Sequence, residues 1–173
     1  MTDSPAARLQ AVTDRAEIKD LLIAYARGID RFDRELLASV FHPDATDDHG
    51  VFRGTAADFV DWVFQFQQDT VFTQHCITNE FIELDGDVAW CESYYTARTQ
   101  TTAAAGKPSE FITASGRYVD RMERRDGRWR IADRRVILNS RRITPVEEGP
   151  IAGVDAALFP PSRRDRQDIS YLR

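Results

Sequence analysis

Cysteine is scarce in this sequence, which contains only Cys76 and Cys91 among 173 residues. Two cysteines at this spacing do not form a thiolate metal site, because such a site needs ligands gathered in closely spaced pairs. Both lie on neighbouring predicted strands, so a disulfide stays open, although free buried thiols in a reducing compartment are the favoured interpretation. We expect no metal ion to be bound through them.

Long apolar runs are also missing. No segment approaches the roughly 18–20 consecutive apolar residues that would span a bilayer. The N-terminal stretch MTDSPAARLQ has neither a basic beginning nor an apolar core, so it does not have the pattern of a secretory signal. We therefore expect a soluble, cytoplasmic protein with no membrane partner.

An excess of basic residues is absent too. The formal net charge is −5 and the isoelectric point is about 5.2. A protein that follows a nucleic-acid backbone needs a clear basic excess, so nucleic acid is not an expected partner. The arginines between residues 121 and 142 alternate with Asp and Glu, which favours a solvated sheet face of mixed charge.

The first seventy residues have the period of helices. Asp14 with Glu17 has the form of a capping box, and an apolar stripe follows it at helical spacing. The stripe consists of Ile18, Leu21, Leu22, Tyr25 and Ile29. Asp33 caps a second, short helix that ends before Pro43, and a third helix follows Gly54-Thr55. Residues 46–53 between them are interpreted as a strand or loop.

From residue 72 the period changes to that of strands. We expect strands at about 73–84, 87–99, 110–124 and 128–139. Asp85-Gly86 and Asp126-Gly127 predict two tight hairpins between them. Separate runs of helices and strands predict one α+β domain over residues 1–145, in which helices close one side of a strongly bent, mostly antiparallel sheet. Such a sheet leaves a cone-shaped cavity that suits a small hydrophobic ligand.

The remaining residues, 146–173, lose all periodicity. They are predicted to form an irregular C-terminal tail that packs on its own subunit or on a neighbouring one.

Several segments resemble the SnoaL-like branch of the nuclear transport factor 2 superfamily, whose members are cone-shaped α+β barrels. The resemblance covers about residues 8 to 145. It is carried by RAEIKDLL from Arg15, YARGID from Tyr25, LASVFHPDA from Leu37, HCITN from His75, and GRYVD from Gly116 through RRDGRWRI ending at Ile131. Since this superfamily supports many unrelated activities, fold alone does not assign function.

Within that branch the pattern is similar to the scytalone dehydratases, hexachlorocyclohexane dehydrochlorinases and bile acid 7α-dehydratases. The resemblance implies a His–Asp dyad deep in the cavity, formed by His75 and Asp30. A carboxylate beside an imidazole holds one tautomer and increases its basicity, which makes a competent general base. It also implies that Tyr25 enters the pocket as a phenol that assists a departing oxygen.

Four further residues are expected to bind substrate. By resemblance Arg134 contacts it, and Trp62, Phe66 and Tyr94 are expected to line the cavity, with the first two at its mouth. His42 is predicted to be exposed at a helix end. Asp47 and His49 face the same side of a strand, but two ligands without a third do not make a metal site. The dehydrochlorinases have a tryptophan near Asp47.

The resulting function hypothesis is a cofactor-independent lyase or isomerase, with dehydration of a small hydrophobic cyclic substrate as the first choice. One alternative is a non-catalytic β subunit of a ring-hydroxylating dioxygenase. Another is a ligand-binding protein of the same fold. By resemblance we also expect a homo-oligomer, either a trimer or a dimer.

Overall fold

The computed structural model describes residues 4–103, 108–146 and 156–172. Two helices come first, and a strand pair and a third helix follow. Their bounds are α1 Pro5–Asp30, α2 Arg34–Ser39, β1 Phe41–Asp48, β2 Arg53–Thr55 and α3 Ala56–Phe66. Four long strands and two short 3-10 helices complete the chain. These are β3 Thr70–Asp85, β4 Val88–Thr101, β5 Glu110–Arg125, β6 Arg128–Pro145, η1 Ala156–Leu158 and η2 Ile169–Tyr171.

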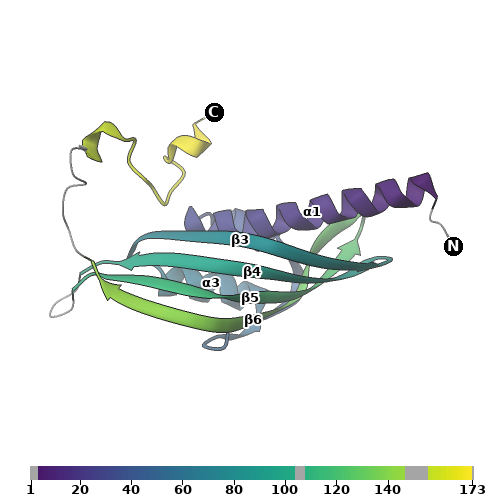
Figure 1. The fold of residues 1–173 in the computed structure, drawn as a ribbon, viewed down its shortest axis with the longest axis horizontal. Coiled ribbons are helices and arrows are strands. Elements are labelled where there is room, and N and C mark those ends of the chain that lie inside the picture. The colour runs from purple at the N-terminus through teal and green to yellow at the C-terminus, as the bar shows by residue number, and fades with distance from the viewer. Residues whose placement is uncertain (1–3, 104–107, 147–155, 173) are drawn as a thin grey trace.

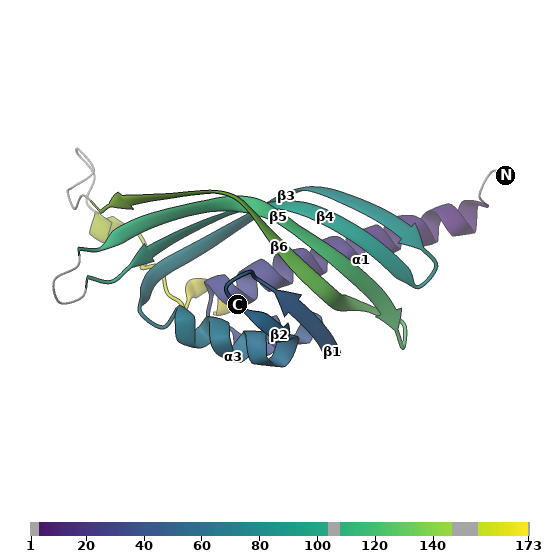
Figure 2. The ribbon, with the colours of Figure 1, turned by 90° about the horizontal axis from the view of Figure 1, so that it is seen from below.

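The strands form one sheet in the order β2-β1-β6-β5-β4-β3. All neighbours are antiparallel except β1 and β6, which are parallel. The sheet bends over α1 and α3, so that both helices lie on its concave side (Figure 2). This confirms the predicted fold class, an α+β cone-like barrel.

The first helix begins earlier than its sequence signal predicts. Ser4 is the N-cap, and its side chain accepts a hydrogen bond from the Ala7 main-chain N–H. Asp14 is instead a buried side chain that accepts from Trp129 Nε1 at 3.0 Å and from Arg124 Nη1 at 2.6 Å. A carboxylate engaged in tertiary bonds is not available as a cap, so the prediction of a cap at Asp14 was wrong.

The long strands alternate between an inner and an outer face. On β4 the inner residues are Ala89, Cys91, Ser93 and Tyr95, and the residues between them are outer. Cys76 pairs with Thr96 on the outer face, whereas Cys91 is inner, and both thiols are free. The two cysteines therefore lie on opposite faces of the sheet, and the expectation that both are buried was wrong for the exposed Cys76.

Two further observations concern the tail and the helices. The end of the described tail, around η2, lies beside the C-terminal half of α1 (Figure 1). It is held there by Arg27 to Ser170 at 3.1 Å and by Tyr171 to Asp33 at 3.0 Å. Residues 147–155 lie outside the described residues. No helix among the described residues is both long and apolar enough to cross a membrane.

Gly28 lies where α1 and α2 approach each other closely. A Cβ atom at this position would lie 2.9 Å from the Leu37 Cα and Cβ atoms. Glycine ordinarily costs a helix about 1 kcal/mol relative to alanine, so its presence near the end of α1 has a packing reason.

We therefore expect Gly28→Ala to lower the free energy of unfolding by about 1–3 kcal/mol, because the gain in helix propensity is smaller than the cost of overpacking. Urea unfolding measures this change. Ala16→Gly, at an exposed position of the same helix, is the control and isolates helix propensity. A more stable Gly28→Ala variant would show that the two helices can separate without cost.

Candidate active site

The end of α1 is fastened to β3 by one carboxylate. Asp30, the last residue of α1, accepts from His75 Nδ1 through Oδ1 at 2.7 Å. Its Oδ2 accepts from the His75 main-chain N–H at 2.9 Å. The side chains are 8% and 13% exposed for His75 and Asp30. The structure thus brings together the two residues that the sequence analysis selected.

This contact leaves one imidazole nitrogen free. Because the carboxylate accepts the proton on Nδ1, the neutral ring carries its lone pair on Nε2. Nε2 has no hydrogen-bond partner among the described residues, nor is it among their fully enclosed unpartnered atoms, so it borders open space. A basic nitrogen that is oriented from behind and open in front can accept a proton from a bound molecule.

The C-terminal tail reaches this end of the molecule. Arg164 Nη1 donates to the carbonyl oxygen of Gln67 at 3.0 Å and to that of Thr70, the first residue of β3, at 3.2 Å. Its guanidinium lies over the Phe32 ring at 4.7 Å. The tail therefore packs on its own subunit beside Asp30 and the start of β3.

Tyr25 belongs to a different cluster from the Asp30–His75 pair. Its hydroxyl lies 3.2 Å from His49 Nε2, and His49 Nδ1 in turn contacts Asp47 Oδ1. The Tyr25 side chain is fully buried, and burial raises the pKa of its phenol. The sequence analysis placed Asp47 and His49 on one side of a strand but missed their contact with Tyr25, since nothing local links α1 to β1.

Arg134 packs against Tyr25 and forms a fully buried ion pair with Asp120. Its Nε and Nη2 each donate to an Asp120 carboxylate oxygen at 2.7 Å. The guanidinium carbon lies 4.0 Å from the ring centre of Tyr25 and 4.2 Å from that of Tyr118. Burial alone lowers the pKa of Arg134, but the Asp120 carboxylate raises it and the net direction is upward.

Two buried polar atoms near this pair lack partners among the described residues. They are Arg134 Nη1, a donor, and Asp47 Oδ2, an acceptor. Asp47 and Arg134 are register partners on β1 and β6, so both belong to the same part of the interior. Unpartnered buried polar groups are rare in proteins and are typical of functional sites.

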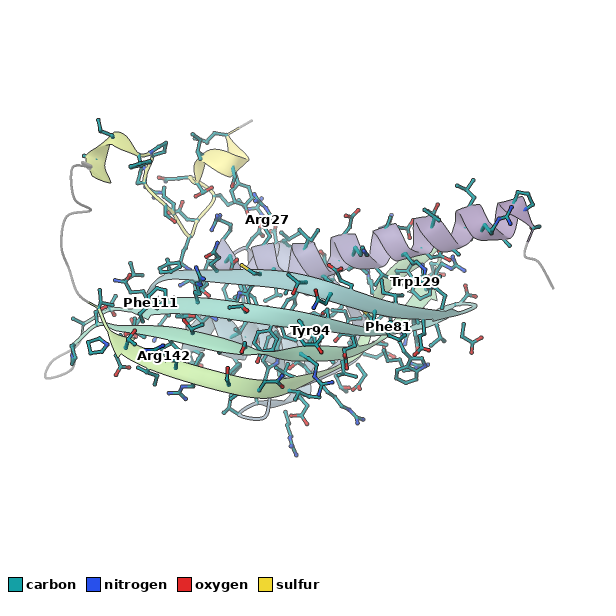
Figure 3. The ribbon with its side chains drawn as sticks, in the orientation of Figure 1. Arg27, Phe81, Tyr94, Phe111, Trp129 and Arg142 are labelled. Atoms are coloured by element: carbon teal, nitrogen blue, oxygen red, sulfur yellow. The ribbon has the colours of Figure 1, made fainter. Side chains whose placement is uncertain are left out.

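The aromatic residues expected to line the cavity have different surroundings. Trp62 stacks on Phe66, with 4.9 Å between ring centres. Its ring centre lies 6.5 Å from that of His49, so Trp62 belongs to the cluster of Tyr25 and His49. Tyr94 is 42% exposed and lies on the outer face of the sheet, the face turned to the viewer in Figure 3. The placement of Tyr94 in the pocket was wrong, because the pleat of β4 directs Tyr95 inward instead.

His42 also differs from its prediction. It is buried, and its Nε2 lies 2.9 Å from the Glu123 carbonyl oxygen. It lines a groove of about 410 Å³ between α2, α3 and β1, together with Phe41, Val60 and Arg130. None of the expected site residues lines this groove. Among the described residues, no three His, Cys, Asp or Glu side chains gather as metal ligands would.

Comparison with known proteins places this geometry in a family. The model of the SnoaL-like domain matches residues 10–135. A search of curated protein sequences finds no significant match.

Solved structures share the fold at low sequence identity. A type 2 hexachlorocyclohexane dehydrochlorinase is 22% identical, with a TM-score of 0.72, and the match covers 85% of this chain and 99% of that one. A scytalone dehydratase-like protein from Novosphingobium aromaticivorans is 19% identical, with a TM-score of 0.68 and coverages of 84% and 97%. A protein from Kribbella flavida is 23% identical, with a TM-score of 0.69 and coverages of 76% and 95%.

Fold and comparisons together define the class as a cone-shaped α+β barrel of the nuclear transport factor 2-like superfamily. The chain belongs to the SnoaL-like family.

The buried ion pair allows a stability test. We expect Asp120→Asn to lower the free energy of unfolding by about 3–5 kcal/mol, because it leaves the Arg134 charge buried and unpaired. Asp61→Asn breaks the exposed pair with Arg34 and should cost about 0–1 kcal/mol. Urea unfolding of both variants checks this. Equal losses in the two would mean that water reaches Arg134.

Proposed function

We propose that this protein is a cofactor-independent lyase, most plainly a dehydratase, with His75 as its general base and Asp30 as the residue that orients it. The observation that carries the proposal is the contact between Asp30 and His75 Nδ1, which leaves Nε2 open to a bound molecule. Asp30 holds both the main-chain and the ring N–H of the same histidine, so the ring has one orientation before substrate arrives.

The proposed reaction is an elimination. Nε2 of His75 takes a proton from a carbon beside a carbonyl group, the Asp30 carboxylate balances the imidazolium charge, and the neighbouring carbon–oxygen bond breaks with release of water. Arg134 is a buried cation with one unpartnered N–H, and it stabilises the negative charge that develops on the substrate. Tyr25 is fully enclosed against His49, so the proton that turns the leaving hydroxyl into water comes from another donor.

A hydrophobic cyclic substrate suits these surroundings. The core around Tyr25 is rich in aromatic rings, among them Phe41, Phe59 and Tyr118. Two structural neighbours are named for eliminations, a dehydrochlorinase and a dehydratase, and this supports the choice of reaction class. A homo-oligomer, dimer or trimer, stays a prediction for this chain.

Neither of the two non-catalytic alternatives needs the arrangement of Asp30 and His75. A stacking β subunit or a ligand-binding protein has no use for a histidine held in one tautomer with a free basic nitrogen. Size-exclusion chromatography of the protein purified from its native host tests the first alternative, since a β subunit would elute together with a larger iron-containing chain.

The base is tested directly with His75→Ala and Asp30→Asn. The test substrate is 3-hydroxycyclohexanone, whose dehydration gives an enone that is measured by its ultraviolet absorbance. We expect no turnover of this substrate by His75→Ala. The second variant, Asp30→Asn, should lose about 10²–10⁴-fold in kcat, because the imidazole is no longer held in the working tautomer.

The control is His42→Ala, which removes an imidazole outside the site and should keep its activity where the fold is intact by circular dichroism. Wild-type turnover in the His75→Ala variant would overturn the assignment of the base.

A further inference from the structure

Tyr95 shares the inner face of the sheet with His75. His75 pairs with Ala97 across β3 and β4, and Ile77 pairs with Tyr95. Tyr95 is thus two residues along β4 from the partner of His75, on the same side. Diagonal neighbours of this kind lie about 7–8 Å apart, within the reach of an aromatic side chain. The Tyr95 ring leans over β5, where it stacks on Tyr118 and its hydroxyl lies beside Gly116, so a ligand that touches both Tyr95 and His75 must lie across β4.

The hydroxyl of Tyr95 is unused by the protein. The residue is 7% exposed, yet its phenol has no hydrogen-bond partner among the described residues. It is not among their fully enclosed unpartnered atoms, so its oxygen borders open space, as Nε2 of His75 does. Buried tyrosines almost always find a partner for this group, so a ligand is the natural one.

The Tyr95 ring is held in place from two sides. It stacks on Tyr118 with 4.6 Å between ring centres and 19° between planes. Its hydroxyl passes so close to Gly116 that a Cβ atom there would lie 2.8 Å from the oxygen. The absence of a side chain at Gly116 therefore makes room for this orientation. Burial also raises the pKa of Tyr95, so the group stays a protonated donor at neutral pH.

Tyr25, by contrast, already has a partner. Its hydroxyl lies against His49 Nε2 and its side chain is fully enclosed. Tyr118 is a third inner phenol that also lacks a hydrogen-bond partner among the described residues, but it lies on β5, one strand farther from His75. Of these two unpartnered phenols, Tyr95 is the one on the strand next to His75.

We propose that Tyr95 is a catalytic residue that donates a hydrogen bond to an oxygen of the ligand bound against His75. This inference rests on the proposed elimination. There, the C–H bond breaks and its proton goes to His75 Nε2, while the C–O bond breaks and its electron pair leaves with oxygen. The Tyr95 O–H proton passes to that oxygen to form water, and the phenolate regains a proton from the imidazolium through solvent.

The test compares Tyr95→Phe with Tyr94→Phe. The two positions are adjacent and the chemical change is identical, but the second lies on the outer face. On 3-hydroxycyclohexanone we expect kcat to fall at least about 10²-fold in Tyr95→Phe and to stay within about twofold of wild type in Tyr94→Phe. The melting temperature of both should match wild type, because neither hydroxyl makes a hydrogen bond to any of the described residues.

A better leaving group separates proton donation from a structural effect. Acetate departs without a proton, so with 3-acetoxycyclohexanone the Tyr95→Phe loss should shrink to a few-fold while that of His75→Ala persists. An equal loss on both substrates would overturn the role of Tyr95 as donor and leave His75 as the base.

Binding gives a measurement that does not depend on turnover. Nuclear magnetic resonance titration with 1-tetralone, a cyclic ketone, should show affinity about three- to tenfold weaker in Tyr95→Phe than in wild type or Tyr94→Phe. Equal affinity in all three overturns the proposed contact. Weaker binding in Tyr95→Phe with no turnover of either substrate by wild type supports the contact and overturns the elimination instead.

Discussion

The arrangement of this site depends on one carboxylate with two bonds to one residue. Asp30 ends α1 and takes both the main-chain and the ring N–H of His75, so the same group joins helix to sheet and orients the imidazole. A hydrogen bond to a charged group contributes about 1.5–3 kcal/mol, and two such bonds from one residue leave the ring little freedom. The tail residue Arg164 packs beside this junction and encloses it further.

The interior has an unusual balance of polar and aromatic groups. The buried Asp120, Arg134 and Asp47 and the half-buried His49 form a polar set among the rings of Tyr25, Tyr118 and Phe59. A well-packed apolar core would be more stable, because each charge loses its hydration when it is buried. Natural proteins keep such groups where function needs them, and consistency between levels of structure is usually broken only there. The interior is therefore a fitting surrounding for charge that develops during a reaction.

Local strand geometry decides which residues belong to the site. In β3 the register shifts between Thr78 and Phe81, and Asn79 has a φ of 55°, which asparagine tolerates better than most residues. This bulge exchanges the two faces, so that Phe81 is exposed on the outer face and Ile82 is inner (Figure 3). Without the bulge, Ile82 and Leu84 would face solvent and Phe81 would face inward. The inner positions of Tyr95 and His75 follow from the same register.

The sequence by itself determined the elements and the order in which they occur. The change of period near residue 72, the cap at Asp33, and the turns at Gly86 and Asp126-Gly127, whose φ angles are positive, are local features. Resemblance added the pair Asp30 and His75. Only the tertiary structure decided that Tyr25 contacts His49 and that Tyr95, one residue from the expected Tyr94, faces inward. The reason is that side-chain direction in a sheet reverses with every residue, so a single bulge or a shift of one position changes the face.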